Sequence, residues 1–138
     1  MYPLYQLRVV APDHTVFAGQ VQSLVAPGSD GYFGVLHGHA PLLAELAAGE
    51  FSLVDEQGQT RYYAISGGFL EVSSLGEVTV VADAAEAAED IDVTRAKAAE
   101  ERARQRLQTD EMEVDQTRAQ AALQRAMTRL RVVSRGRA

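Results

Sequence analysis

Cysteine is absent from the 138 residues, and proline occurs only four times. The lack of cysteine excludes disulfide bonds, cysteine-ligated zinc and cysteine nucleophiles. No stretch approaches the roughly 18 apolar residues of a membrane-spanning helix, so we expect no direct membrane insertion. The opening residues carry neither a basic flank nor a long apolar run, and we expect no secretory signal. These absences are compatible with a cytoplasmic location.

Acidic residues are absent after Asp115, whereas six arginines follow from Arg118 onward. Residues 1–90 carry two basic and twelve acidic side chains, a net charge of −10. Residues 91–138 carry eleven basic and seven acidic side chains, a net charge of +4. This asymmetry predicts two units with different partners, the second attracted to an anionic surface.

The first unit has the pattern of short strands. Segments rich in β-branched and aromatic residues alternate with turn signals, at Pro27-Gly28, Gln57-Gly58, Gly67-Gly68 and Leu75-Gly76. The predicted strands are residues 5–9, 21–26, 50–56, 60–66, 69–73 and 77–83. Several short strands at this spacing are typical of an all-β sandwich or barrel, and 46% hydrophobic residues are enough for a core.

After Asp83 the period changes to that of helices. The run AAEAAED at 84–90 predicts a linker or a first helical turn. One helix is expected from Ile91 to about Leu107 and a second from about Asp115 to Val133, paired as an antiparallel hairpin. The apolar positions are Ala96, Ala99, Ala103 and Leu107 on the first helix, and Ala119, Ala122, Leu123, Ala126, Leu130 and Val133 on the second.

The contact faces of this hairpin are mostly alanine. Burial stabilises by roughly 25 cal/mol per Å², and an alanine methyl group buries little area. The hairpin is therefore expected to be marginal when undocked. The residues leave two interpretations open, an element that opens at low cost and a plain appendage that stays in place.

The segment IDVTRA at 91–96 poses a separate question. Asp92 is a suitable residue to cap the start of a helix. Arg95 lies in the first helical turn, where the helix dipole disfavours positive charge. The arginine is either a docking residue or half of a ligand site.

Several strings together resemble one family, the epsilon subunit of bacterial and chloroplast F-type ATP synthases. They are F-x-G at 17–19, PGSDGYFGVLHGHAPLL at 27–43, SGGFLEV at 66–72 and RAMTRLRV at 125–132. The resemblance covers nearly the whole chain. It implies an α+β architecture with a ten-stranded β-sandwich over residues 1–84 and a regulatory α-helical hairpin over residues 85–138.

The resemblance also implies a function. Members are non-catalytic rotor subunits of proton- or sodium-driven ATP synthases, peripheral on the cytoplasmic face of the plasma membrane. The sandwich is expected to dock on the gamma subunit and the c-ring. The hairpin is expected to lie folded on the sandwich, or to extend toward the alpha and beta subunits and inhibit ATP hydrolysis.

Partner-binding residues are implied in two places. The segment expected to form a loop facing the c-ring comprises Gly28, Ser29, Asp30, Gly31, Tyr32 and Phe33, with Tyr32 where some relatives carry glutamate. His39, in GHAPLL, is expected to contact gamma. On the second helix, Arg118 and Arg131 are expected to face acidic segments of the partner subunits.

Some bacterial members of the family bind ATP in the folded hairpin through a motif similar to I/L-D-x-x-R-A. This chain matches the motif and carries further arginines on both helices. The implied ATP-binding residues are Ile91, Asp92, Arg95, Ala96, Arg102, Arg125, Arg129 and Glu86. Four arginines converging in an antiparallel hairpin would repel each other unless an anion such as a triphosphate lay among them. No G-x-x-x-x-G-K loop is present, so the site would sense ATP and not hydrolyse it.

Two other functional classes fit the sequence less well. A free-standing β-sandwich module with a basic hairpin could bind an anionic partner such as nucleic acid, but the acidic first unit opposes this. An enzyme is disfavoured because no catalytic set stands out. A metal site at His37-Gly38-His39 is also disfavoured, since two histidines without nearby acids are a poor ligand set, and a turn is expected there.

Overall fold

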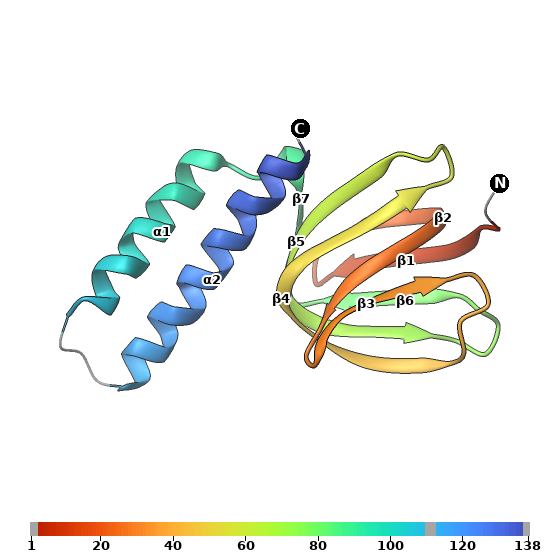
Figure 1. The fold of residues 1–138 in the computed structure, drawn as a ribbon, viewed down its shortest axis with the longest axis horizontal. Coiled ribbons are helices and arrows are strands. Elements are labelled where there is room, and N and C mark those ends of the chain that lie inside the picture. The colour runs from red at the N-terminus through yellow and green to blue at the C-terminus, as the bar shows by residue number, and fades with distance from the viewer. Residues whose placement is uncertain (1–2, 110–112, 137–138) are drawn as a thin grey trace.

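The computed structural model describes residues 3–109 and 113–136, which form a β-sandwich beside a helical hairpin (Figure 1). The strands are β1 (Tyr5–Ala11), β2 (His14–Gly28), β3 (Gly31–Leu36), β4 (Leu42–Asp55), β5 (Thr60–Val72), β6 (Val78–Ala82) and β7 (Ala85–Ala87). A 3-10 turn, η1 (Ala88–Asp90), leads into α1 (Val93–Leu107) and α2 (Glu113–Gly136). The expected sandwich followed by a hairpin is confirmed.

The described strands form one sheet in the order β1-β6-β5-β4-β2-β3, with β7 added to β5. A further pairing of β1 with β2 closes the sheet around the core, and β1 with β6 is a parallel pair. The resemblance implies ten strands, whereas the described residues contain seven. The counts differ because β2, β4 and β5 run for 15, 14 and 13 residues and bend with the sheet without a break.

Gly67-Gly68 is a bend inside β5, and the predicted turn there is wrong. The φ angles of the two residues are +114° and +133°, which side chains on L-residues rarely adopt. A Cβ atom on Gly68 would lie 2.0 Å from the Val81 carbonyl oxygen. Glycine therefore lets β5 pass close to β6 while it bends. The turn signals at Gln57-Gly58 and Leu75-Gly76 do fall between strands.

Two segments differ from their predicted structure. The expected loop at 28–33 is mostly strand, because β2 and β3 pair up to Gly28 and Gly31 and leave only Ser29 and Asp30 as the turn. The expected linker or helical turn at 84–90 forms β7 and η1, because residues 85–87 find hydrogen-bonding partners on β5.

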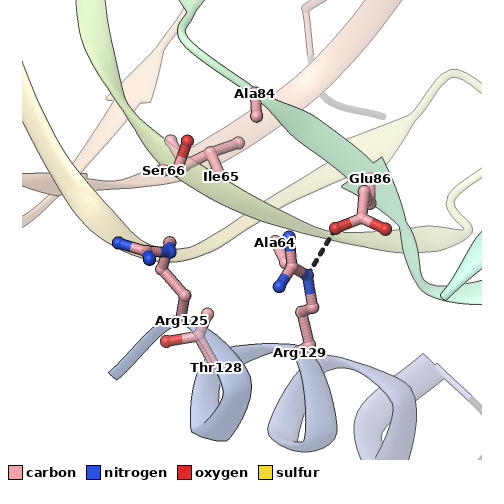
Figure 2. Close-up of a pocket in the computed structure, with 8 residues that line it drawn as sticks. All are labelled: Ala64, Ile65, Ser66, Ala84, Glu86, Arg125, Thr128 and Arg129. Atoms are coloured by element: carbon pink, nitrogen blue, oxygen red, sulfur yellow. Dashed lines mark hydrogen bonds and ion pairs between the residues drawn. The ribbon is translucent and has the colours of Figure 1, made fainter. Parts of the chain in front are cut away.

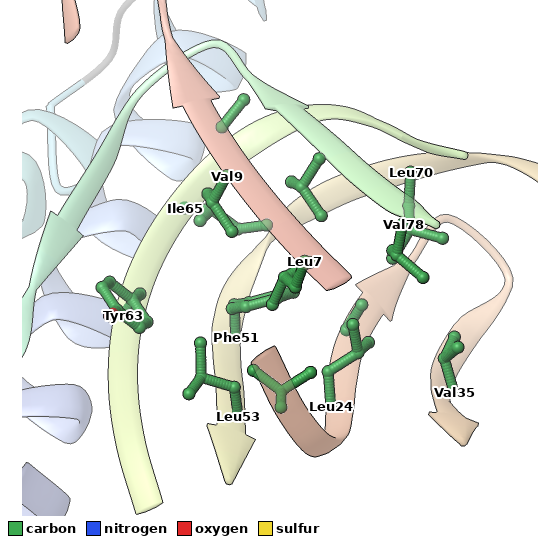
Figure 3. Packing of buried hydrophobic residues seen from close by; sticks show 14 of the residues in the cluster. Leu7, Val9, Leu24, Val35, Phe51, Leu53, Tyr63, Ile65, Leu70 and Val78 are labelled. Carbon is green, nitrogen blue, oxygen red and sulfur yellow. The ribbon is translucent and has the colours of Figure 1, made fainter. Parts of the chain in front are cut away.

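The sandwich core is made of inward-facing aliphatic and aromatic side chains. Leu7, Val9, Phe51 and Leu70 are completely buried and belong to one cluster that the closed sheet surrounds (Figure 3). Tyr5 is also buried, and its hydroxyl donates a hydrogen bond to the Val35 carbonyl oxygen at 2.6 Å. This bond ties β1 to β3, two strands that do not pair with each other.

The second helix lies between α1 and the sandwich (Figure 1). The α1–α2 seam buries the predicted alanines Ala96, Ala103, Ala119 and Ala126. A second side of α2, which the sequence does not reveal, buries Thr128, Val132 and neighbouring residues against the sandwich and η1. Among the described residues, no helix combines the length and apolarity needed to cross a membrane.

Candidate functional site

A cleft of about 260 Å³ opens where η1, the start of α1 and the C-terminal half of α2 meet. Its lining comprises Glu86, Asp90, Ile91, Asp92, Arg95, Ala96, Ala99, Arg102 and Arg129. Seven of the eight predicted ATP-binding residues thus line one cleft, and Arg125 is the exception.

Local sequence explains how IDVTRA shapes this cleft. Asp92 is the N-cap of α1, and its Oδ1 atom accepts a hydrogen bond from the Arg95 backbone N–H at 3.1 Å. Ile91 is buried in an apolar cluster with Ala96 and Val132, which anchors the start of α1 to the end of α2. The Arg95 side chain is exposed. Asp92 thus caps α1 through Oδ1, and among residues 3–109 and 113–136 its second carboxylate oxygen has no hydrogen-bond or ion-pair partner.

An ion pair spans the cleft from the sandwich to the hairpin. Glu86 lies on β7, where it is paired with Ala64 of the antiparallel strand β5. Arg129 extends from α2 toward Glu86 (Figure 2). The Arg129 Nε atom lies 2.5 Å from Glu86 Oε1, and both side chains are about one-third exposed. Arg129 thus already has an anionic partner within the chain.

Arg125 lies one helical turn away and takes a different direction. It lines a separate small cavity of about 10 Å³ with Ser66, Thr128, Glu86 and Arg129 (Figure 2). The four arginines are therefore not all in one cleft. Three line it, and Arg125 borders the adjoining cavity under α2.

The charges in the cleft are balanced and not uniformly basic. Three carboxylates, from Glu86, Asp90 and Asp92, face three guanidinium groups, from Arg95, Arg102 and Arg129. Among residues 3–109 and 113–136, neither Arg95 nor Arg102 has an ion-pair partner. Two arginines are thus free to contact an anion, while the carboxylates can accept hydrogen bonds from a donor group of the same ligand.

The predicted partner-binding residues lie apart from this cleft. The Ser29 N–H donates to the Glu45 carbonyl oxygen at 3.0 Å, which fixes the tip of the β2–β3 hairpin. The Tyr32 hydroxyl accepts from the Glu50 N–H at 3.1 Å, so this side chain lies across the sheet and is not free at the tip. Arg118 and Arg131 are exposed on α2.

His39 lines a different groove at one end of the sandwich, between the 37–41 and 74–77 turns. Its Nδ1 atom lies 2.7 Å from the Ala40 carbonyl oxygen. His37 and Gly38 form the expected turn. Within the described part of the chain, no group of three or more histidine or acidic side chains could hold a metal ion.

Sequence reasoning missed two features around the site. Asp90 and Ala99 line the cleft without belonging to the motif. Asp90 directly precedes Ile91 in the chain, and Ala99 follows Ala96 on the helix face predicted to be apolar. Arg135 on α2 lies 2.9 Å from the Glu50 carboxylate on β4, as an ion pair without a hydrogen bond. No sequence spacing could indicate this contact, because it joins residues 85 positions apart.

Family models match almost the entire chain. Residues 4–88 match the β-sandwich domain of the ATP synthase delta/epsilon chain, and residues 89–134 match its long α-helix domain. The chain belongs to the ATP synthase delta/epsilon family. It is an epsilon subunit of the central stalk, a non-catalytic part of ATP synthase. The resemblance drawn from the sequence motifs is confirmed.

Relatives of this epsilon subunit come from several bacteria. The ATP synthase epsilon chain of Koribacter versatilis is 45% identical over 109 residues, which cover 79% of this chain and 75% of the relative. The ATP synthase epsilon chain of Nitratidesulfovibrio vulgaris strain DP4 is 50% identical over 101 residues, which cover 73% of this chain and 74% of the relative.

Solved structures agree with the fold. A chain of the Euglena gracilis mitochondrial ATP synthase, in a structure of OSCP, F1 and the c-ring, superposes with a TM-score of 0.81 at 28% identity. The match covers 93% of this chain and 81% of that one. A chain of the Tetrahymena thermophila central stalk and c-ring, 10% identical with a TM-score of 0.64, shares the fold.

Proposed function

We propose that this epsilon subunit couples gamma to the c-ring through its sandwich, in a complex driven by proton or sodium flow across the membrane. In this proposal the subunit is peripheral on the cytoplasmic face, and its hairpin inhibits ATP hydrolysis when it extends toward the alpha and beta subunits. ATP bound in the cleft holds the hairpin folded. The observation that supports ATP-dependent regulation is the cleft, because residues of both helices and of β7 in the sandwich line it together.

The cleft suits a ligand with two unlike ends. Arg95 and Arg102 would contact the phosphates, since guanidinium groups match phosphate oxygens in geometry and charge. The free Asp92 oxygen would accept from the adenine amino group, with Ala96 beside the base. Arg129 would join the phosphates when its pair with Glu86 opens, and Arg125 would approach from the adjoining cavity.

The energetic argument is one of linkage. A ligand that binds only the folded hairpin stabilises it by about 2.7 kcal/mol when present at a hundred times its Kd. The hairpin is held on the sandwich by the small apolar cluster around Ile91 and Val132 and by two ion pairs, of which the partly exposed Arg129–Glu86 pair contributes only about 0–1 kcal/mol. Cellular ATP could therefore decide between the folded and the extended state.

The test is calorimetric titration of ATP into the full chain. Arg102→Gln should weaken binding about ten-fold or more, because it removes a charge-assisted hydrogen bond. Arg104→Gln is the matched control, since Arg104 is on the same helix but pairs with Glu100 outside the cleft. Asp92→Asn removes the negative charge but keeps a side chain that can cap the helix, so weaker ATP binding by this variant would reflect ligand recognition and not loss of the cap. No heat at millimolar ATP would refute the ATP site.

The inhibitory role needs the assembled complex. An ATP synthase whose epsilon subunit ends after Asp90 should hydrolyse ATP faster than the intact complex at low ATP. Equal hydrolysis rates under every nucleotide condition would contradict the inhibitory role, whatever the calorimetry gives.

A further inference from the structure

Two acidic residues flank Ala64 in one row across three strands of the sandwich. Glu50 on β4 is paired with Ala64 on β5, and Ala64 is paired in turn with Glu86 on β7. Side chains of directly paired residues point to the same face of a sheet. Because Ala64 packs in the apolar cluster with Val132 of α2, both carboxylates lie on the face of the sheet that this helix covers.

The last turns of α2 carry a matching row. The helix has two arginines there, Arg129 and Arg135, and each forms an ion pair with one of these carboxylates. Val132, halfway between the arginines in the helix, is completely buried in the cluster that contains Ala64. An acid–alanine–acid row on the sandwich thus meets an arginine–valine–arginine row on the helix, and this match favours one register of α2 on the strands.

The two ion pairs differ in their surroundings. Glu86 is about one-third exposed and lines the proposed ATP-binding cleft together with Arg129, so a bound triphosphate would compete for that arginine. The Glu50 side chain is only 13% exposed, and neither Glu50 nor Arg135 lines the cleft. A ligand in the cleft would therefore leave the Glu50–Arg135 pair intact.

Close packing at the end of α2 brings this second pair together. A Cβ atom on Gly136 would lie 2.4 Å from the Cβ atom of Ala88, so the last turn of α2 lies directly against η1. Within residues 3–109 and 113–136, Arg135 is the one charged group paired with Glu50, whose Oε1 atom is buried without a hydrogen bond. The nearly buried carboxylate therefore depends on Arg135 for its counter-charge.

We propose that Glu50 and Arg135 form a nucleotide-independent latch, which makes docking of α2 conditional on the Arg135 guanidinium group and sets how often the hairpin opens without ATP. When α2 is docked, the latch neutralises the Glu50 carboxylate. When the hairpin leaves the sandwich, both charges return to water. The proposal rests on the proposed function, because it concerns the same folded state that bound ATP would stabilise.

The difference in exposure predicts unequal effects of removing each partner. Arg135→Gln leaves the nearly buried Glu50 carboxylate without a counter-charge, which is strongly unfavourable in the docked state. Glu50→Gln leaves a guanidinium group that is 55% exposed and stays hydrated. Removing both charges leaves no unpaired charge, so the double variant should dock better than Arg135→Gln alone.

The experiment measures amide hydrogen exchange of the free chain without nucleotide, at residues 126–132 of α2 and away from its last turn. Arg135→Gln should speed exchange there by about ten-fold or more, and Glu50→Gln by about three-fold or less. The double variant should exchange more slowly than Arg135→Gln. Arg106→Gln is the control and should exchange like the wild type, because Arg106 is exposed on α1 and has no ion-pair partner among the described residues.

A second variant tests the contact with η1 while both charges remain. Gly136→Ala should also speed exchange at residues 126–132, because the added Cβ atom forces the last turn of α2 away from Ala88. Alanine favours the helix itself, so faster exchange would reflect undocking and not loss of helix propensity.

The possible outcomes separate the latch from the function above. Equal exchange of Arg135→Gln and the wild type would overturn the latch. A double variant that exchanges faster than Arg135→Gln would also overturn it, because the two residues would then hold α2 independently. Exchange without nucleotide does not involve the ATP site, so a failed ATP titration would leave the latch standing. Faster exchange of Arg135→Gln with unchanged ATP hydrolysis by the complex that contains it would support the latch and count against the inhibitory role.

Discussion

Arg129 on α2 and Glu86 on β7 form an ion pair, with Nε 2.5 Å from Oε1, at the junction of the hairpin and the sandwich. The same arginine lines the proposed phosphate-binding cleft. The carboxylate of Glu86 therefore pairs with a guanidinium group that a triphosphate bound in the proposed site would also need, so the two anions would compete for Arg129.

The first prediction follows from this competition. Glu86→Gln should bind inorganic triphosphate about five-fold more tightly than the wild type, because it removes a repulsive charge worth about 1 kcal/mol at a distance of several ångströms. Triphosphate without the base isolates the charge effect from base recognition. Calorimetry measures the change, and Glu89→Gln is the control, because Glu89 is exposed and does not line the cleft. Equal affinities of the two variants would contradict the competition.

The second prediction concerns the alanine seam. Ala126 is completely buried between the helices. Ala126→Leu should destabilise the docked hairpin by about 1–3 kcal/mol, since added methylene groups overpack a close contact. Amide hydrogen exchange should then speed up in α1 and α2 and stay unchanged in the strands.

Ala98→Leu is the control for this seam, because Ala98 is on an exposed position of α1. If both variants exchange like the wild type, close packing of alanines does not hold the helices together.

The helical hairpin could be predicted because its signal is local. The recurrence of Ala96 and Ala103 at helical spacing identifies the face that α1 presents to α2. The second buried side of α2, with Thr128 and Val132, was not predictable, because it depends on where the sandwich meets the helix. The residues Ile91, Asp92, Arg95 and Ala96 line one cleft because they are neighbours in the chain at the start of α1.

Long-range pairing explains what sequence reasoning missed. The strand β3 lacks a clear alternation because Gly31 and Gly34 interrupt it, and its register is set by β2. Arg125 and Arg129 share a helix face, yet they separate because β7 places Glu86 beside only one of them as an ion-pair partner. The position of Glu86 depends in turn on pairing with β5, which the run AAEAAED does not reveal.

The third prediction compares two glycines with positive φ. Gly68→Ala should destabilise the sandwich by about 3 kcal/mol or more, because a Cβ atom would collide with the Val81 carbonyl oxygen and the φ of +133° would be strained. Gly76→Ala, at φ +80° with nothing within 4 Å of the added atom, should cost only about 1–2 kcal/mol. Urea denaturation of both variants measures the difference. Similar losses would mean that backbone strain alone, and not the close approach of β6, requires glycine at position 68.

The fourth prediction concerns pH. Asp55 is buried, and its carboxylate accepts hydrogen bonds from the Gln59 N–H at 2.9 Å, the Gln57 N–H at 3.0 Å and Arg61 Nε at 3.1 Å. The Gln59 bond contributes most to a pKa below the ordinary aspartate value, and it outweighs the opposing effect of burial. A carboxyl group whose pKa is lower in the folded than in the unfolded state stabilises the fold above the unfolded pKa of about 4, and this stabilisation is lost as pH falls through the folded pKa.

Asp55→Asn should therefore lower the thermal unfolding midpoint at pH 7, and the gap from the wild type should narrow below about pH 4. Thermal melts followed by circular dichroism from pH 7 to pH 3 measure both effects. Glu56→Gln is the control, because Glu56 is the exposed neighbour in the same turn and should leave the profile unchanged. If the difference in unfolding midpoint between the wild type and Asp55→Asn stays constant down to pH 3, the negative charge of Asp55 does not stabilise the fold. The loss in the variant would then come from the changed side-chain packing and hydrogen bonding, which do not depend on pH.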